Sequence, residues 1–582
     1  MGCREENLMK SFLRSLPLLS ALLLLGCTDS PDPSPVRAAN PGADPALVTP
    51  GTPGSPAAGS SRAGTIYTVT IPSPLGSGET ISATVMEPTT LTGGQKYPLV
   101  LHSHGFGQSK QTAGEAGGVL MDGTQRLLDA GYGVVSFDER GHGDSGGLIT
   151  VMDPDREGQN VIRVFDWAEA NLDWLLYRGG NLVAGSMGQS YGGGWQLMMN
   201  SIDPKQRLDA IAPRITWYDL TFSLNPGGVI KSGWISILFG AGTGAGDGNN
   251  FDPYVNTTLR NGLTSNTIAP DSLDYFGYHS NRYFCERQAL ATNGGVGTAP
   301  KIASKTPPRI NALFFQGMRD TLFNFSEANA NYECLKKLGG DVRLFGYQSG
   351  HNSLQAILDP GQVAQPPTSA IDNACGPFDT DAAIKLFFDE HLKGMVGAAN
   401  SLGKDVCLSL AVGDAVRIPS VTKGKAGTAY TVPATNVVAG LGELPVAADL
   451  GIVAGANGDV FGGIPEVELD LADTTGASAA AGRDAIIFVG VGHQRASAPG
   501  VWDLMDNQLL PLRGLGKHNV SLVGVAERLA PGDRIGLVFY GASQQFPLTG
   551  SAHPMSHFTA PVTITGKAWM PLLGNLPAAT AP

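Results

Sequence analysis

The first two thirds of the chain alternate short apolar runs with amphipathic segments. Apolar runs that suit buried strands occupy residues 97–102, 132–137, 208–215, 310–315 and 342–347. Residues 161–176 and 382–393 instead repeat apolar side chains with helical periodicity, so that these side chains share one face. Strands that alternate with helices predict an α/β domain with a mostly parallel sheet and helices on both faces. We expect this domain to cover residues 65–400.

Two regions depart from this alternation. Residues 216 to about 305 are rich in aromatic residues, glycine and proline, and we interpret them as a helical cap over the site, with a second lobe as the alternative. Beyond residue 400 the pattern is that of strands alone. Residues 466–471 alternate strictly between polar and apolar side chains, and turns recur at Pro531-Gly532. This pattern predicts a C-terminal β-sandwich of jelly-roll type over residues 401–582.

The N-terminal residues have the features of a targeting segment. Lys10 and Arg14 precede an apolar run at 16–25 that is too short to span a bilayer as a stable helix. The run ends in Leu24-Leu25-Gly26-Cys27, which resembles a bacterial lipobox. In that signal the cysteine thiol is diacylated and the cysteine becomes the new N-terminus. We therefore expect residues 1–27 to be a lipoprotein signal peptide.

A lipid on Cys27 would place the protein outside the cytoplasm, in the bacterial cell envelope. Thr28, and not Asp, follows Cys27, so the usual signal for retention in the inner membrane is absent and we expect the outer membrane or the cell surface. Residues 28–64 are mainly Pro, Ser, Ala and Gly, which predicts a flexible linker. A plain secretory signal is the alternative, and either Met1 or Met9 can be the true start.

Composition narrows the possible partners. Charged residues make up 15% of the chain, the formal net charge is −12, and basic runs are absent, which argues against nucleic acid as a partner.

Four cysteines follow the N-terminal region, and an even number in an exported protein favours two disulfides. Three pairings of Cys285, Cys334, Cys375 and Cys407 are possible, and neighbour pairing closes the shortest loops. Zinc-binding spacings are missing, and residues 247–252 read as a polar turn, so we predict no metal and no cofactor.

One sequence motif contains a candidate catalytic nucleophile. An apolar run leads into Gly188-x-Ser190-x-Gly192, and a segment compatible with a helix follows. This order of strand, sharp turn and helix is typical of a nucleophile elbow, which exposes the serine hydroxyl. Gly143-Asp144-Ser145-Gly146 also matches a serine motif, but no apolar helix follows it. We therefore predict Ser190 as the nucleophile.

A serine hydroxyl needs a base to remove its proton and an acid to orient that base. In folds with this elbow the chain order is Ser, then Asp or Glu, then His. Asp320 follows the strand at 310–315, and His351 follows the strand at 342–347, so both lie at carboxyl ends of strands. We predict Asp320 as the acid, with Glu327 as the alternative, and His351 as the base.

An oxyanion hole needs two donors that point at the developing negative charge. The backbone N–H of Tyr191, directly after the nucleophile, is the first candidate. The second is the backbone N–H of Phe106, in the loop after the first central strand. A tight turn without a catalytic role is the alternative for this loop.

Together these motifs resemble the X-Pro dipeptidyl-peptidase/cocaine esterase family of serine hydrolases over residues 65–575. The resemblance rests on Gly188-Gln-Ser190-Tyr191-Gly-Gly, Asp138-Glu-Arg140-Gly-His-Gly-Asp-Ser145, Gly317-x-x-Asp320 and the C-terminal sandwich. It implies an α/β-hydrolase domain with a helical cap and a jelly roll, the triad Ser190, Asp320 and His351, and cleavage of esters, amides or X-Pro dipeptides. The family often supplies a tyrosine hydroxyl to the oxyanion hole from a Tyr-x-x-Lys stretch. Here the matching stretch is Phe106-Gly-Gln-Ser-Lys110, which lacks that hydroxyl.

We therefore expect a secreted or surface-anchored serine esterase that acts on a small ester or a short peptide. An X-Pro dipeptidyl-peptidase and a catalytically inert surface-binding lipoprotein are the alternatives. A dipeptidyl-peptidase must hold the free α-ammonium of its substrate, normally with buried carboxylates. The acids of the cap are sparse and show no paired arrangement in the sequence: Asp219, Asp247, Asp252, Asp271, Asp274 and Glu286. This sparseness and the missing tyrosine hydroxyl both favour the ester.

Overall fold

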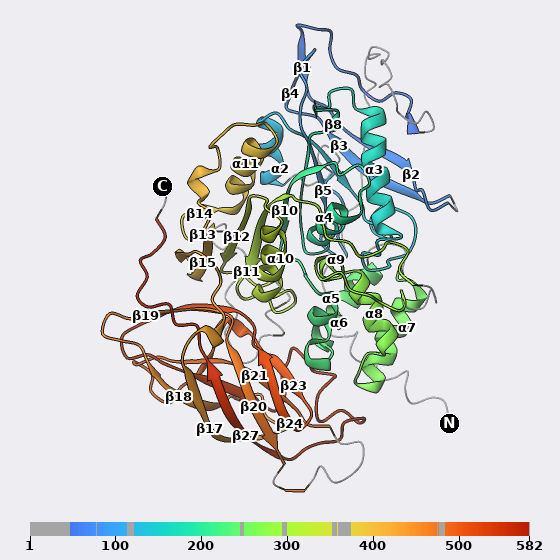
Figure 1. Cartoon of the computed structure of the whole chain (residues 1–582). Coiled ribbons are helices and arrows are strands. Elements are labelled where there is room, and N and C mark those ends of the chain that lie inside the picture. Colours follow the sequence, from blue (N-terminus) through green and yellow to red (C-terminus); the bar gives the residue numbers. More distant parts are fainter. Residues whose placement is uncertain are drawn as a thin grey trace, which may run out of the picture.

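The computed structural model has an α/β body, a helical cap and a C-terminal β-sandwich (Figure 1). It describes residues 47–76, 78–112, 121–244, 250–293, 299–351, 355, 358, 374–473, 475–476 and 484–580. The predicted signal peptide and Cys27 lie outside the described residues. Within the described ranges, every helix is too short or too polar to cross a membrane.

A ten-stranded sheet forms the centre of the α/β body, in the order β16-β15-β12-β11-β10-β9-β5-β6-β3-β2. The seven strands from β15 to β6 run parallel, β16 and β3 run in the opposite direction, and β2 pairs antiparallel with β3 at the edge. The predicted mostly parallel sheet is confirmed. The strands are β2 (Ile66–Pro72), β3 (Thr80–Met86), β5 (Leu99–Ser103), β6 (Gly133–Phe137), β9 (Ala184–Gln189), β10 (Leu208–Arg214), β11 (Asn311–Gly317), β12 (Val342–Tyr347), β15 (Val406–Ala411) and β16 (Asp414–Ile418).

Helices cover both faces of this sheet. On one face α3 (Glu157–Asn171), α4 (Tyr191–Ile202) and α10 (Phe325–Lys337) pack in one hydrophobic cluster, and on the other lie α2 (Asp122–Asp129) and α11 (Thr380–His391). Successive side chains of a strand point to opposite faces. In β5, Leu99 and Leu101 therefore belong to the first cluster and Val100 to the second. Burial on both faces explains why the central strands read as continuous apolar runs.

In the described part of the cap there are five α-helices, α5 (Leu220–Leu224), α6 (Ser232–Gly244), α7 (Pro253–Ser265), α8 (Pro270–Tyr278) and α9 (Asn281–Cys285). Two of the helices begin at an aspartate whose side chain accepts a hydrogen bond from the first turn: Asp219 before α5 and Asp252 before α7. A disulfide between Cys285 and Cys334 ties α9 of the cap to α10 of the body. The second disulfide, Cys375–Cys407, completes the neighbour pairing.

Two sheets form the β-sandwich and enclose a separate hydrophobic cluster. In β20 the side chains of Val467, Leu469 and Leu471 are buried and the residues between them are exposed, as the alternating pattern predicts. One sheet contains β17 (Ala429–Val438), β27 (Pro561–Trp569), β20 (Glu466–Ala472) and β24 (Gly516–Ser521). The other contains β18 (Val446–Val453), β26 (Arg534–Tyr540), β21 (Ile486–Gln494), β22 (Asp503–Leu504) and β23 (Leu510–Arg513).

Both ends of the α/β body lie outside the boundaries expected at residues 65 and 400. At the C-terminal end β15 pairs with β12, and β16 pairs with β15, so the central sheet continues to Ile418. β15 and β16 follow each other as a hairpin without a helix between them, as strands of a sandwich do, which explains the difference. At the N-terminal end the expected linker packs on α3 from Leu47 onward, where Trp167 Nε1 donates to Thr49 Oγ1.

Candidate active site

Ser190 lies in the sharp turn between β9 and α4, with φ 57° and ψ −116°. A non-glycine residue in this region costs about 1–3 kcal/mol and persists only where the surroundings fix it. The two glycines of the motif allow this. A Cβ on Gly192 would lie 2.2 Å from the carbonyl oxygen of Ser103 in β5, and one on Gly188 would lie 2.5 Å from the carbonyl oxygen of Gly192. The motif is therefore set by close packing of the turn against the neighbouring strand.

The structure brings the three predicted side chains together. Ser190 Oγ lies 2.9 Å from His351 Nε2, and His351 Nδ1 lies 2.7 Å from Asp320 Oδ2. Ser190 is 6% exposed and Asp320 is fully buried. With Nδ1 donating to the carboxylate, Nε2 is free to accept the hydroxyl proton. This arrangement can activate Ser190 as a nucleophile.

Hydrogen bonds fix Asp320 and His351 in this orientation. Asp320 Oδ1 accepts from the backbone N–H groups of Leu322 and Phe323, both at 2.9 Å. The imidazole of His351 lies between Trp234 and Phe323, which meet it edge-on at ring distances of 5.4 and 5.2 Å. The backbone N–H of His351 donates to Gln355 Oε1 at 2.8 Å. Trp234 and Gln355 could not be assigned to the site from the sequence, because neither belongs to a motif with fixed spacing.

The two alternative residues have structural contacts. Ser145 Oγ donates to the carbonyl oxygen of Asp138 and accepts from the backbone N–H of Ser82, so it closes a turn. Glu327 Oε2 accepts from the backbone N–H groups of Tyr218 and Asp219, each at 2.7 Å, and so holds the start of the cap. His351 is not a partner in any of these bonds.

Both predicted oxyanion donors border the space next to Ser190. Tyr191 is the first residue of α4, and Phe106 lies in the loop after β5; their rings pack at 5.3 Å. The first N–H groups of a helix have no partner within the helix and favour negative charge. The roles of the two backbone N–H groups stay a prediction.

Lys110, four residues after Phe106, is buried and paired with carboxylates. Its Nζ lies 2.9 Å from Asp138 Oδ2 and 2.6 Å from Asp144 Oδ2. Lys110 thus holds the loop that follows β6 against the loop that contains Phe106.

Buried titratable groups lie beneath the turn. His104 Nε2 accepts from the backbone N–H of Glu139, so its proton is on Nδ1, which donates to the carbonyl oxygen of Gly105. Burial lowers the pKa of His104 to about 4, which keeps this imidazole neutral. Burial also raises the pKa of Glu139 to about 8 and that of Glu157 to about 7, with nearby carboxylates adding to both shifts.

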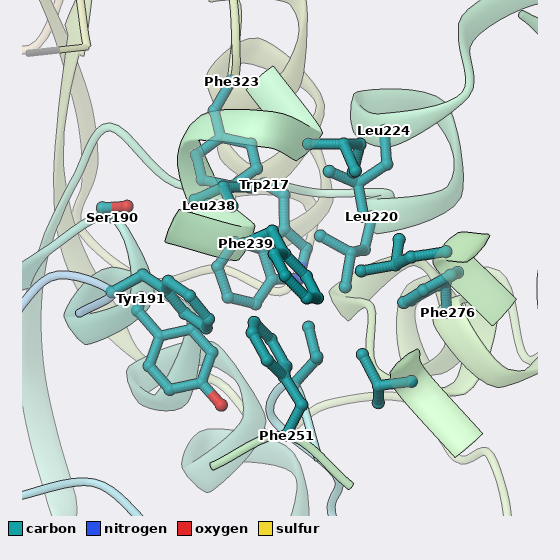
Figure 2. Close-up of a pocket in the computed structure, with 15 residues that line it drawn as sticks. Ser190, Tyr191, Trp217, Leu220, Leu224, Leu238, Phe239, Phe251, Phe276 and Phe323 are labelled. Carbon is teal, nitrogen blue, oxygen red and sulfur yellow. The ribbon is translucent and has the colours of Figure 1, made fainter. Parts of the chain in front are cut away.

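An apolar cavity opens on one side of Ser190. Figure 2 shows the side chains of Trp217, Phe239 and Phe251 gathered beside the serine. Phe239 and Phe251 stack almost parallel, 5.5 Å apart at an angle of 7°. Besides Ser190 and Tyr191, all the residues that line the cavity are apolar or aromatic: Phe106, Val151, Trp217, Leu220, Leu224, Ile235, Leu238, Phe239, Phe251, Val255, Leu259, Phe276 and Phe323.

The described acids of the cap do not line this cavity. Asp219 Oδ2 accepts from Arg282 at 2.7 Å, and Arg282 also binds Glu286 at 2.8 Å. Asp252 lies 3.3 Å from Arg156. Asp247 lies outside the described residues. These contacts give Asp219, Glu286 and Asp252 partners within the protein.

Comparison with known proteins agrees with this geometry. The model of the X-Pro dipeptidyl-peptidase (S15) family matches residues 77–353, a range that includes Ser190, Asp320 and His351. The fold and the site thus define a hydrolase of the α/β-hydrolase class. The match confirms the family resemblance that the sequence motifs indicate.

Solved structures share the fold over nearly the whole chain. An α-amino acid ester hydrolase has a TM-score of 0.57 at 16% identity and covers 92% of this chain and 100% of its own. A CocE/NonD family hydrolase from Staphylococcus aureus has a TM-score of 0.55 at 13% identity, covering 88% and 97%. An aminopeptidase from a marine sediment Thaumarchaeota archaeon has a TM-score of 0.56 at 14% identity, also covering 88% and 97%.

A curated relative matches a shorter region. An uncharacterized 31.7 kDa protein from the traX-finO intergenic region of Escherichia coli is 29% identical over 129 residues, or 22% of this chain. The chain spans 40% of the length of that relative.

Proposed function

We propose that this hydrolase is a serine esterase with Ser190 as nucleophile, His351 as general base and acid, and Asp320 as the orienting carboxylate. Ser190 Oγ attacks the ester carbonyl while its proton moves to His351 Nε2. The backbone N–H groups of Tyr191 and Phe106 stabilise the resulting oxyanion. His351 then protonates the departing alkoxide, and the acyl group stays on Ser190. Water, activated by the same imidazole, releases the acid.

The apolar lining of the cavity supports an ester over an N-terminal dipeptide. An α-ammonium group buried there would lose its hydration, and the lining residues offer no carboxylate to replace it. An apolar acyl chain would instead bury its surface against Phe239, Phe251 and Trp217. Cleavage of an ester also places a smaller demand on leaving-group protonation by His351 than cleavage of an amide. The phenylalanine at position 106 is consistent with the easier reaction, because it lacks the hydroxyl that a tyrosine would add.

A comparison of substrates tests this proposal. We expect p-nitrophenyl esters of short and medium apolar acids to show a much higher kcat/KM than Gly-Pro or Ala-Pro p-nitroanilide. Ser190→Ala should remove both activities and serves as the control for background hydrolysis. The family match makes an X-Pro dipeptidyl-peptidase the second candidate. A dipeptidyl anilide preferred over every ester tested would establish that candidate instead.

We also propose that Cys27 carries a lipid that anchors the enzyme in the cell envelope. The lipobox-like sequence supports this proposal, and so do the two disulfides of the structure, because disulfides persist mainly in oxidising compartments. Expression in a bacterium with labelled fatty acid should label the wild type, and Cys27→Ser should lose the label and leave the membrane fraction. Cys3→Ser is the matched control and should stay labelled. Membrane association of Cys27→Ser equal to that of the wild type would contradict the anchor.

A further inference from the structure

The loop that carries Asp320 turns its backbone carbonyl groups outward. Its N–H groups at Leu322 and Phe323 point inward to the Asp320 carboxylate. Six consecutive carbonyl oxygens, from residue 318 to residue 323, all accept hydrogen bonds from side chains outside the loop. Buried carbonyl groups need such partners, since an unpaired one costs about 1–3 kcal/mol.

Four buried side chains supply these bonds. Gln316, directly before the loop, donates to Phe323, and Gln355, from the segment after His351, donates to Arg319. Lys231, at the start of α6 in the cap, donates to Thr321 at 2.7 Å and to Leu322 at 3.0 Å.

The fourth side chain, Gln508, comes from the β-sandwich. Its Nε2 donates to the carbonyl oxygens of Met318 at 3.1 Å and of Asp320 itself at 3.0 Å. Gln508 is 4% exposed, so water does not replace these bonds easily.

The sandwich holds Gln508 rigidly. The residues before it, Asp506 and Asn507, have φ values of 50° and 58°, which non-glycine residues seldom adopt. Asp506 Oδ2 accepts from the backbone N–H of Ala526 at 2.9 Å, and Gln545 Nε2 donates to the carbonyl oxygen of Asn507 at 2.9 Å. The strained turn therefore presents the amide of Gln508 to the acid loop from a fixed position.

We propose that Gln508 is a positioning residue for Asp320, so that the β-sandwich takes part in building the catalytic site. Gln508 does not reach the substrate. It acts by fixing the backbone on both sides of the acid, which sets the distance and angle between the Asp320 carboxylate and His351 Nδ1. The inference rests on the proposed roles of Ser190, His351 and Asp320.

The test uses the full chain and the variant Gln508→Met, which keeps the volume of the side chain but removes the two hydrogen bonds. We expect kcat for a p-nitrophenyl ester to fall roughly 10- to 100-fold, because small misplacements of catalytic groups have effects of this size. KM should change little. The acidic limb of the pH profile of kcat/KM should move to lower pH, because a misaligned carboxylate stabilises the imidazolium form of His351 less than an aligned one does.

Arg513→Met is the matched control. Arg513 Nη1, also from the sandwich, donates to two carbonyl oxygens of the cap, of Gly228 and Asn266, and not to the acid loop. It should lower the melting temperature but keep kcat and the acidic limb near those of the wild type. If Gln508→Met and Arg513→Met have the same kcat and the same acidic limb, the proposal is wrong.

A second variant decides the question if Gln508→Met does not fold. Gln508→Glu keeps the shape, donates one hydrogen bond when protonated, and repels both carbonyl groups when ionised. Its kcat relative to the wild type should therefore fall as pH rises, and a ratio independent of pH would overturn the proposal. A wild type without esterase activity would instead reject the proposed function, so the two failures are distinguishable.

Discussion

At the scale of single residues, the proposed chemistry depends on one strained serine and two partners from distant loops. Ser190 has a backbone conformation that close packing of Gly192 against β5 makes possible. His351 Nε2 lies 2.9 Å from Ser190 Oγ, and Asp320 Oδ2 lies 2.7 Å from His351 Nδ1. Ser145, which has a similar local sequence, holds a turn instead.

Substitution of these residues should separate the two serines. We expect Ser190→Ala and His351→Ala each to lower kcat by roughly three to six orders of magnitude without unfolding the protein, because both act as one unit. Asp320→Asn should lose less than either. Ser145→Ala should keep turnover and reaction with a fluorophosphonate probe. Probe labelling that survives in Ser190→Ala and disappears in Ser145→Ala would show that the nucleophile is assigned wrongly.

The sequence was sufficient for the three catalytic candidates because each lies shortly after the carboxyl end of a strand. Parallel strands end at the same edge of a sheet, so Ser190, Asp320 and His351 could be expected to meet there. Gln316, Gln355 and Gln508 could not be predicted in this way. An amide that donates to a backbone carbonyl has no required spacing, and Gln508 reaches the acid loop from another domain.

At the scale of elements, the loop after β6 buries charge-bearing groups close to the site. Lys110 binds Asp138 and Asp144 in the first part of this loop. Between them Glu139 and His142 are buried, with 2% and 0% exposure. A carboxyl group without ready access to water resists ionisation, which links the stability of this loop to pH.

Glu139→Gln should reveal that link. Burial raises the pKa of Glu139 from 4.5 to about 8. The contribution of Glu139 to the free energy of unfolding is therefore complete below pH 4.5. It is lost as the pH rises toward 8, where the buried carboxyl group ionises in the folded protein. The amide introduced by the substitution cannot ionise, so the melting temperature of the variant minus that of the wild type should increase by about 2 °C or more between pH 5 and pH 8.

Glu468→Gln is the control for this measurement, because Glu468 is an exposed residue of β20. Its melting temperature relative to the wild type should vary little over the same range. A difference between Glu139→Gln and the wild type that is equal at pH 5 and pH 8 would show that Glu139 is ionised throughout.

At the scale of the whole molecule, changes in the spacing of hydrophobic residues along the chain predict the order of body, cap and sandwich. They do not predict the residues at which one part ends and the next begins. β15 and β16 have a strand pattern that fits either sheet, and only the pairing of β15 with β12 and of β16 with β15 assigns them to the body. Residues from Leu47 onward have the composition of a linker yet pack on α3. Tertiary contacts decided both cases, and composition and periodicity do not report such contacts.

The contact between Gln508 and the acid loop also sets an order of events during synthesis. A ribosome makes Ser190, Asp320 and His351 before it makes Gln508, and domains generally fold as units in that order. An α/β body that folds first contains Ser190, His351 and Asp320 but lacks the two bonds from Gln508 to the loop of Asp320. With the acid held by Gln508 as proposed, the hydrolase reaches full activity only after its last domain has been made and has folded. A newly made chain would then stay weakly active until its synthesis is complete and the sandwich has folded.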